Sequence, residues 1–186
     1  VVYKDILNRE LATQTQGFAS GQYSYQRVAY NGLGQKTFES VPLEYLPLSS
    51  DYGTHYTSYD ALGRLTNKTV DNLGGGMSVT YTFNGSTTNI NANGMTMSRT
   101  HNGVGQLIET VDAIGGKTQY AYDAMGSPIV LQDANGNAIT ATYNGLSQKK
   151  WVDDPNMGRK DFAYTGFGEV ETELDANGDT TSYEYD

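Results

Sequence analysis

The sequence predicts an all-β fold built from tandem antiparallel β-hairpins. The first observation is a fixed period, because aromatic residues recur every 21 residues at Tyr122, Tyr143, Tyr164 and Tyr185, with His101 one period earlier. Regular self-similarity at a period of about 20–50 residues is typical of repeat architectures. The second observation is a pair of turn-forming tetrapeptides in every period. Together they indicate one hairpin per repeat and an antiparallel meander as the whole array.

From Asn102 to Asp186, two kinds of tetrapeptide alternate, with starts 10 and 11 residues apart. The first kind follows each aromatic position, as in Tyr59-Asp60-Ala61-Leu62-Gly63, and we call it the main turn. The second kind, such as Asp133-Ala134-Asn135-Gly136, lies half a period later, and we call it the minor turn. The predicted turn residues are Asp60, Gly63, Gly105, Asp112, Gly115, Asp123, Gly126, Asp133, Gly136, Gly168, Asp175 and Gly178.

The chemistry of these tetrapeptides fits a tight hairpin connection. Asp or Asn at the first position can accept hydrogen bonds from backbone amides further along, and Gly at the fourth position tolerates positive φ. This combination predicts a type I turn followed by a left-handed residue, with a bulge. Gly136 is expected to hold such a left-handed conformation. About six residues remain between successive turns, which is close to the usual strand length.

The segments that enter the main turns alternate between aromatic and polar residues. Tyr120 and Tyr122, then Phe162 and Tyr164, share one face of the predicted strands because strand side chains repeat every second residue. Lys117, Gln119 and Ala121 or Thr140 and Thr142 occupy the other face. We therefore expect a sheet with one apolar and one polar surface. The predicted repeat anchors on the apolar surface are Tyr59, His101, Tyr122, Tyr143, Tyr164 and Tyr185.

The motif and its period resemble the YD repeats of the RHS family. The string from Tyr59 to Leu65, the Asp-Ala-Asn-Gly turns and the terminal run Tyr183 to Asp186 carry this resemblance. The family includes bacterial polymorphic toxins, the B and C components of Tc toxin complexes, and the teneurins. The resemblance implies a curved, spiralling sheet that forms part of a hollow shell. It also implies a structural role in which the shell encloses or presents a C-terminal effector of the same chain.

The repeats are unevenly regular along the chain. Residues 1–58 are expected to form a degenerate N-terminal repeat region, with a loop insertion near 42–53, and residues 59–186 to form tandem repeats that are irregular at 66–100. Within the first region, Leu7 to Thr13 fits either one helical turn or a strand, and Gln22 to Tyr30 fits a strand. The start at Val1 and the end within a turn suggest a piece of a longer chain. Its expected partners are further repeats and the effector.

Composition excludes several classes of function. A net charge of -9 and a pI near 4.6 argue against a nucleic-acid partner, since that affinity depends on clustered Lys and Arg. Cysteine is absent, which excludes disulfides and thiol chemistry. No stretch has the roughly 20 apolar residues of a membrane-spanning helix. The resemblance implies a secreted or cell-surface bacterial protein.

The sequence offers no constellation for catalysis, a cofactor or a metal. His55 and His101 are the only histidines, without zinc-ligand spacing; His101 is expected to replace an anchor tyrosine, and His55 to lie exposed in a loop. The string from Asp175 to Asp179 lacks the sixth-position Gly and twelfth-position Glu of a calcium loop. Asp153 and Asp154 lie on the repeat grid and are not assigned a cleavage role. The chain is therefore not expected to be an enzyme.

Trp151 leaves two interpretations open. As an exposed ring beside Lys149 and Lys150 it could contact a glycan, and as a buried ring it would fill the core while the lysines extend to solvent. The core role is the more common one. Glycan contact belongs to an alternative function, in which the repeats form a surface-exposed module that binds glycans or a protein partner in adhesion or cell contact. Clusters of Tyr with Asn, Gly and Ser do make adaptable binding surfaces.

Overall fold

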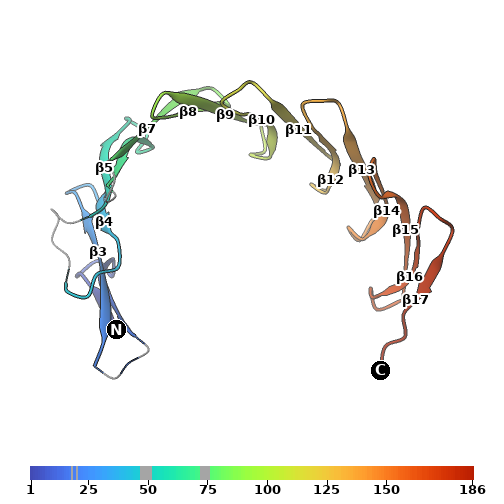
Figure 1. Ribbon diagram of the computed structural model, residues 1–186, viewed down its shortest axis with the longest axis horizontal. Helices are drawn as coiled ribbons and strands as arrows, with labels where there is room; N and C mark the ends of the chain where they lie inside the picture. The colour runs from blue at the N-terminus through green and yellow to red at the C-terminus, as the bar shows by residue number, and fades with distance from the viewer. Residues whose placement is uncertain (18, 20, 47–51, 72–75) are drawn as a thin grey trace. The chain divides into compact units, whose positions relative to one another are not determined.

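The computed structural model is all-β, as predicted. It describes residues 1–17, 19, 21–46, 52–71 and 76–186, and the part it describes contains seventeen strands and no helix. Figure 1 shows the strands following one another in chain order. Two compact units divide the chain, one formed by Val1–Phe83 and Asn89–Thr96, the other by Asn84–Thr88 and Met97–Asp186. Each is a single layer of antiparallel strands.

The strands of the first half are short and joined mostly by tight turns. They are β1 (Val2–Lys4), β2 (Glu10–Gln16), β3 (Tyr23–Tyr30), β4 (Lys36–Ser40), β5 (Gly53–Tyr59), β6 (Leu65–Val70), β7 (Met77–Asn84) and β8 (Thr87–Ala92). Strands β1 to β7 each pair with the next in antiparallel register. The alternative of a helical turn at Leu7 to Thr13 is excluded, because this stretch is a turn followed by β2.

The strands of the second half follow the 21-residue grid closely. They are β9 (Met95–His101), β10 (Leu107–Val111), β11 (Lys117–Tyr122), β12 (Pro128–Gln132), β13 (Ala138–Tyr143), β14 (Lys149–Asp154), β15 (Gly158–Tyr164), β16 (Val170–Leu174) and β17 (Thr180–Ser182). Each pairs antiparallel with the next. Because successive strands reverse direction, all main turns of this unit lie along one edge of the strip and all minor turns along the other.

Strands β7, β8 and β9 are connected by shorter turns than the strands that follow the 21-residue period. Strands β8 and β9 are connected by Asn93 and Gly94 alone, and both have positive φ, 49° and 87°. Positive φ at both central residues defines a type I′ turn, which suits the twist of a two-residue hairpin. Two-residue turns replace the four-residue turns of the grid here. The expected loop insertion near 42–53 and the glycine run 74–76 fall partly outside the described residues, at 47–51 and 72–75.

The turns have the predicted chemistry. In the turn at Asp123 the Gly126 amide donates to the Asp123 carbonyl at 3.1 Å, and the Asp123 side chain accepts from the amides of Met125 and Ser127, both at 2.9 Å. Gly126 has a φ of 90°, and Gly136, expected to be left-handed, has a φ of 88°. At the minor turn that starts with Asp154, the left-handed residue is Gly158. It lies one position beyond the fourth position of the other turns.

A β-bulge follows each regular main turn. Tyr122 pairs with Pro128 whereas Ala121 pairs with Val130, which leaves Ile129 as the extra residue. The same shift occurs beside the anchors His101, Tyr143 and Tyr164. An extra residue of this kind bends the strand and increases its local twist. Leu131 faces Tyr120 and Ile139 on the apolar surface, whereas Val111 pairs with Lys117 on the polar one; the 21-residue equivalent of Val111 is Gln132, which pairs with Gln119.

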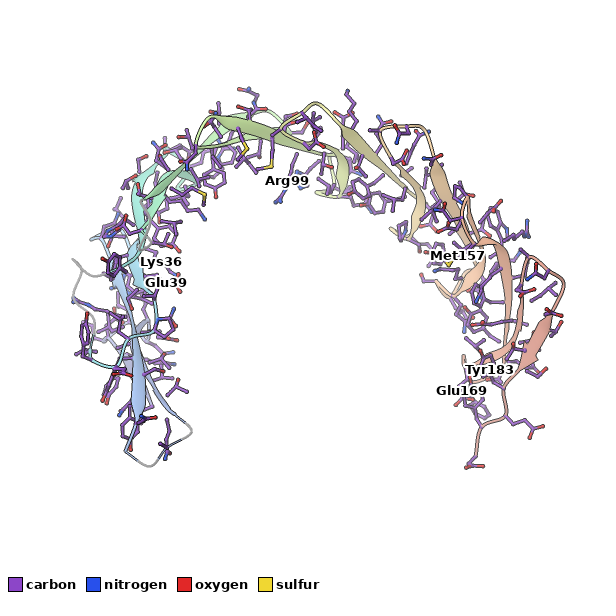
Figure 2. All side chains as sticks on the ribbon, viewed as in Figure 1. Lys36, Glu39, Arg99, Met157, Glu169 and Tyr183 are labelled. Atoms are coloured by element: carbon purple, nitrogen blue, oxygen red, sulfur yellow. The ribbon has the colours of Figure 1, made fainter. Side chains whose placement is uncertain are left out.

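Very few side chains are fully buried, which is a consequence of the single layer. Among the described residues the buried apolar ones are Ala12, Val28, Phe38, Val79 and Ala141. The anchors His101, Tyr122, Tyr143 and Tyr164 are half-buried, so each keeps part of its ring in contact with solvent. Side chains extend from both surfaces of the strands (Figure 2). Stability in such an array comes mainly from contacts between neighbouring repeats.

Candidate functional site: the anchor surface and the Trp151 cluster

The anchors join each repeat to the one before it. The Tyr122 hydroxyl donates to the Leu107 carbonyl at 2.9 Å, and Leu107 is the residue that pairs with the preceding anchor, His101. The equivalent bonds run from Tyr164 to Lys149 at 2.9 Å and from Tyr185 to Val170 at 2.7 Å. In the first unit Tyr59 donates to the carbonyl of Lys36, which pairs with Tyr30. The anchor therefore stabilises the array through its ring and its hydroxyl together.

The expected two-sided character of the sheet is present in the second unit. The register places Tyr120, Leu131 and Ile139 side by side on one surface, together with the anchors. Thr140, Thr142 and Trp151 lie on the opposite surface, because Thr142 is directly opposite Trp151. We call the first surface the anchor surface and the second the polar surface.

A shallow hollow interrupts the anchor surface at Ala141. One row of this surface repeats every 21 residues through Arg99, Tyr120, Ala141, Phe162 and Tyr183. Ala141 is the only member with a single-carbon side chain, and it is 8% exposed. A hollow of about 200 Å³ lies there, lined by apolar groups of three strands and by Lys149. Its walls include Pro128, Leu131, Ile139, Tyr143 and Val152. The missing ring explains the hollow.

Trp151 forms a cation–π contact that sequence analysis missed. The guanidinium carbon of Arg159 lies 4.6 Å from the centroid of the Trp151 ring. Arg159 is held there by Asp161, whose carboxylate accepts two hydrogen bonds from it at 2.8 and 2.7 Å. The bond from Arg159 lowers the pKa of Asp161, and the same bond raises the pKa of Arg159. Trp151 is half-buried on the polar surface, and its cationic neighbour comes from β15 in place of the adjacent lysines.

A polar cluster occupies the anchor surface of the first unit. Lys36 and Glu39 extend from the same side of β4 (Figure 2), with 3.1 Å between Lys36 Nζ and Glu39 Oε2, and the Tyr56 hydroxyl donates to the same oxygen at 2.9 Å. Burial raises the pKa of Tyr56 to about 12, and the bond to the carboxylate acts in the same direction. Burial disfavours ionisation of Glu39 too, but the bonds from Lys36 and Tyr56 outweigh it, so its pKa is lowered.

The expectation that His55 lies exposed in a loop is wrong. His55 is in the middle of β5, half-buried, with its ring centroid 4.8 Å from that of Phe38 on β4. Its Nε2 lies 2.9 Å from Asp71 Oδ2. The segment is a strand because β4 pairs with it directly, Phe38 opposite His55. Sequence spacing could not show this, since the repeat grid is interrupted before Tyr59.

The turns contain a second set of partners that was not predicted. The first and fifth residues of a main turn are chemically matched: Asn144 donates to Gln148 at 2.6 Å, and Asp60 pairs with Arg64 at 2.7 Å. Asp5 and Arg9 form the same pair, which identifies residues 5–9 as one more turn of this type. Burial raises the pKa of Asp60, but the hydrogen bonds from Arg64 and Leu62 outweigh this effect and lower it. The sequence carries this signal as Asn-x-x-x-Gln and Asp-x-x-x-Arg.

The site chemistry is that of packing and hydrogen bonding. Within the described ranges, no group of three or more His, Asp or Glu residues is placed to hold a metal ion. The described residues include no helix that could span a membrane. Asp153 lies on β14 opposite Arg159, and Asp154 opens a minor turn in which its side chain accepts from the Asn156 amide at 2.7 Å. The Asp154 carboxylate thus has a local structural role in its turn.

Comparison with known proteins gives one family match and several similar structures. Residues 101–138 match the RHS Repeat family. The crystal structure of TcdB2-TccC3 is similar with a TM-score of 0.76 and 16% identity, and that of TcdB2-TccC3-Cdc42 with 0.74 and 15%. A third, TcdB2-TccC3 without its hypervariable C-terminal region, has a TM-score of 0.74 and 15% identity. No curated protein sequence matches.

This chain is much shorter than the chains that it matches. All three matches cover 100% of this chain but only 12% of the length of the compared chain. At this level of identity they show the fold: tandem antiparallel hairpins of the kind found in those structures. The family match includes the anchors His101 and Tyr122, together with two main and two minor turns.

Proposed function

We propose that this chain, whose residues 101–138 match the RHS Repeat family, is a length of wall in a protein shell made of such repeats. The shell would enclose or present an effector at the C-terminal end of the same parent chain. The observation that carries this proposal is the hydroxyl-to-carbonyl bond by which Tyr122, Tyr164 and Tyr185 each join one repeat to the preceding one. Such a connection can be repeated indefinitely, as the wall of a container requires.

The single layer supports the same proposal. Each hairpin has an anchor surface that stays partly exposed, so further burial must come from neighbouring repeats or from enclosed material. The outward amides of Thr180 and Ser182 in β17 are not used in pairing with β16, because only alternate residues of an antiparallel pair exchange hydrogen bonds. A further strand at this edge would satisfy them, and continuation of the sheet removes an exposed edge.

A wall segment needs no catalytic group, and we propose none for this chain. A shell that delivers an effector acts outside the cell that makes it, so we also propose that the parent protein is secreted or displayed by a bacterium. The effector, further repeats and a recognised cell surface are its proposed partners. The predicted anchors and turn residues are proposed to act as elements of the wall.

Limited proteolysis of the longest natural chain that contains these residues tests the proposal. The segment C-terminal to the repeats should resist native digestion and be degraded after mild unfolding. A matched chain with a protease site placed in the main turn at Leu146 should be cut at that exposed turn. This control shows that the protease is active on the outside. Rapid loss of the C-terminal segment while the repeats stay intact would reject enclosure and favour the alternative, a surface module that binds glycans or a protein partner.

A further inference from the structure

The third residue of every main turn in the second unit is a large apolar side chain exposed to solvent. These four residues are Val104, Met125, Leu146 and Phe167, which are 81, 62, 79 and 96% exposed. In the first unit Leu33 and Leu62 hold the same position and are 85 and 78% exposed. Scattered apolar residues are normal on a surface, but a row at a fixed period is not scattered. We call the row of the second unit the apolar turn edge.

The turn geometry leaves these side chains largely exposed to solvent. The side chain of the first residue of each turn bonds to backbone amides later in the same turn. Asn144, for example, accepts hydrogen bonds from the amides of Leu146 and Gln148 at 2.9 and 3.0 Å. The second residue is small, being Gly103, Ala124, Gly145 or Gly166. A methyl group added at any of these three glycines would meet no atom within 4 Å. Each turn therefore presents one exposed apolar side chain at its third residue, which we call a knob, beside an open space at its small second residue, which we call a gap.

The apolar turn edge carries no charge at its tip. The second, third and fourth residues of the four turns, such as Gly145-Leu146-Ser147 and Gly166-Phe167-Gly168, are all uncharged in a chain whose net charge is -9. Two copies of an acidic chain repel each other, and this repulsion is smallest where the contacting surfaces are neutral. The tips of the main turns therefore add no charge repulsion to a contact between two copies.

Turn formation itself does not require an apolar third residue. The minor turns of the same unit have Asn135, Asn156 and Asn177 at that position, and Ile114 is their one apolar member. These turns have the same hydrogen bonds, with the Asn135 and Asn177 amides each donating to the first-position Asp at 2.9 Å. The apolar row is therefore a property of one edge and needs an explanation beyond local structure.

We propose that the apolar turn edge is a self-association surface, and that its occupant is the same edge of a second copy. Two strands separate successive main turns, so the knobs are spaced by about 10 Å, twice the distance between neighbouring strands. A second row with the same spacing can place each knob in the gap of the first, whereas an irregular surface cannot. This inference goes beyond the proposed function, since it concerns contact between strips and requires no enclosed effector.

The expected association is weak. Four knobs and their gaps bury less than the roughly 1,200–2,000 Å² of a stable interface, so the contact should be transient and dependent on protein concentration. Sedimentation velocity over a wide concentration range should show a monomer–dimer equilibrium. Replacing Leu146 and Phe167 together by Ser should raise the dissociation constant at least about tenfold, because two of the four apolar contacts are lost. The matched control is Asn135→Ser with Asn177→Ser on the minor-turn edge, which should leave it unchanged.

The absence of cysteine allows the contact to be located directly. Leu146→Cys should form an intermolecular disulfide under mild oxidation much faster than Asn135→Cys, which lies at the same turn position on the other edge. Pairing between open strand edges is the competing explanation. Ser182→Pro removes an outward amide of β17 and blocks strand pairing there without touching the main turns. Dimerisation that survives this change and is lost in the double Ser variant supports the proposal.

Three results would overturn it. They are a monomer at every concentration, equal cross-linking of Leu146→Cys and Asn135→Cys, or a dimer abolished by Ser182→Pro but not by the double Ser variant. These readouts do not depend on proteolytic protection of a C-terminal segment. Failure of this inference and failure of the proposed shell role can therefore be told apart.

Discussion

The hydroxyl group of Tyr122 donates a 2.9 Å hydrogen bond to the main-chain carbonyl of Leu107, fifteen residues earlier. Leu107 pairs with His101, so the bond reaches from one anchor to the strand partner of the preceding anchor. Tyr164 and Tyr185 repeat the relationship at the same separation. A 21-residue period in sequence thereby becomes a chain of contacts between repeats.

Tyr122→Phe should lower the free energy of unfolding by about 1 kcal/mol, the usual net contribution of one hydrogen bond. The ring stays in place, and the Leu107 carbonyl loses its donor. Tyr122→Leu should cost more because packing is lost as well. Chemical denaturation of both variants measures the difference. Equal stability of wild type and Tyr122→Phe would show that the hydroxyl bond contributes nothing.

A reciprocal pair of substitutions tests the left-handed turn position. Ser147 has a φ of 59°, where most main turns have glycine, and a residue with a side chain is strained in that region. Ser147→Gly should raise the free energy of unfolding by about 0.5–1 kcal/mol, because relief of the left-handed strain outweighs the greater flexibility of glycine in the unfolded chain. Gly105→Ser should lower it by a similar amount. Gly105 is the matched site because a side chain there meets no atom within 4 Å, so backbone conformation alone is changed. Changes of the same sign in both variants would contradict the turn assignment.

The sequence predicts the regular part of the fold well because turn chemistry is local. Asp123 and Gly126 act through bonds inside a five-residue segment, so the turn can be recognised without knowing its distant neighbours. The turn chemistry predicts a bulge within the turn, but the further bulge at Ile129 escapes prediction, because its extra residue has no fixed type, being Ile129 in one repeat and Lys150 in the next. The turn at Asp5 was missed because Asn8, with a φ of 63°, replaces the glycine.

The contacts between strands were harder to predict. The environment of Trp151 depends on Arg159, which lies eight residues away and on the next strand. The adjacent Lys149 and Lys150 therefore do not identify the cation that contacts the ring. The sequence does not place His55 in a strand, because that strand pairs with Phe38 across a connection that does not follow the 21-residue period. Periodicity identifies which residues share a surface, but it does not identify which side chains meet across it.

The hydrogen-bonded pair of Tyr56 and Glu39 should make the folded protein less stable at alkaline pH. The pKa of Tyr56 is about 12 in the folded protein and about 10 in the unfolded chain. A raised pKa contributes stability that is fully present below pH 10 and is lost as the pH rises toward 12. Tyr56→Phe should therefore lower stability at pH 8 by about 1 kcal/mol, after allowance for solvent screening. The gap between the two proteins should narrow above pH 10. Denaturation midpoints at both pH values check this, and a gap that widens with pH would reject the assignment.

Glu39 gives the acid counterpart of that experiment. Its pKa is lowered in the folded protein, so its contribution is present above the ordinary carboxyl pKa and is lost as the pH falls through the folded value. Glu39→Gln removes the charge but keeps the shape of the side chain. The stability difference between wild type and Glu39→Gln should shrink as the pH falls below about 4. A difference that stays constant to low pH would show that the carboxylate charge is not the stabilising feature.

Arg159 should shield the single tryptophan from solvent. The Arg159 guanidinium covers the Trp151 ring at 4.6 Å and is fixed by Asp161, so Arg159→Ala should expose the ring. We expect a red shift of the emission maximum and an increase of about twofold in acrylamide quenching, since a cation–π contact and its covering area are both lost. Asp161→Asn keeps the arginine but weakens its fixation, and should give an intermediate change. Lys150→Ala is the matched control, because that lysine adjoins Trp151 in sequence but is not the cation over its ring. Should Lys150→Ala expose the ring as much as Arg159→Ala, the cross-strand contact would not be what holds Trp151 in place.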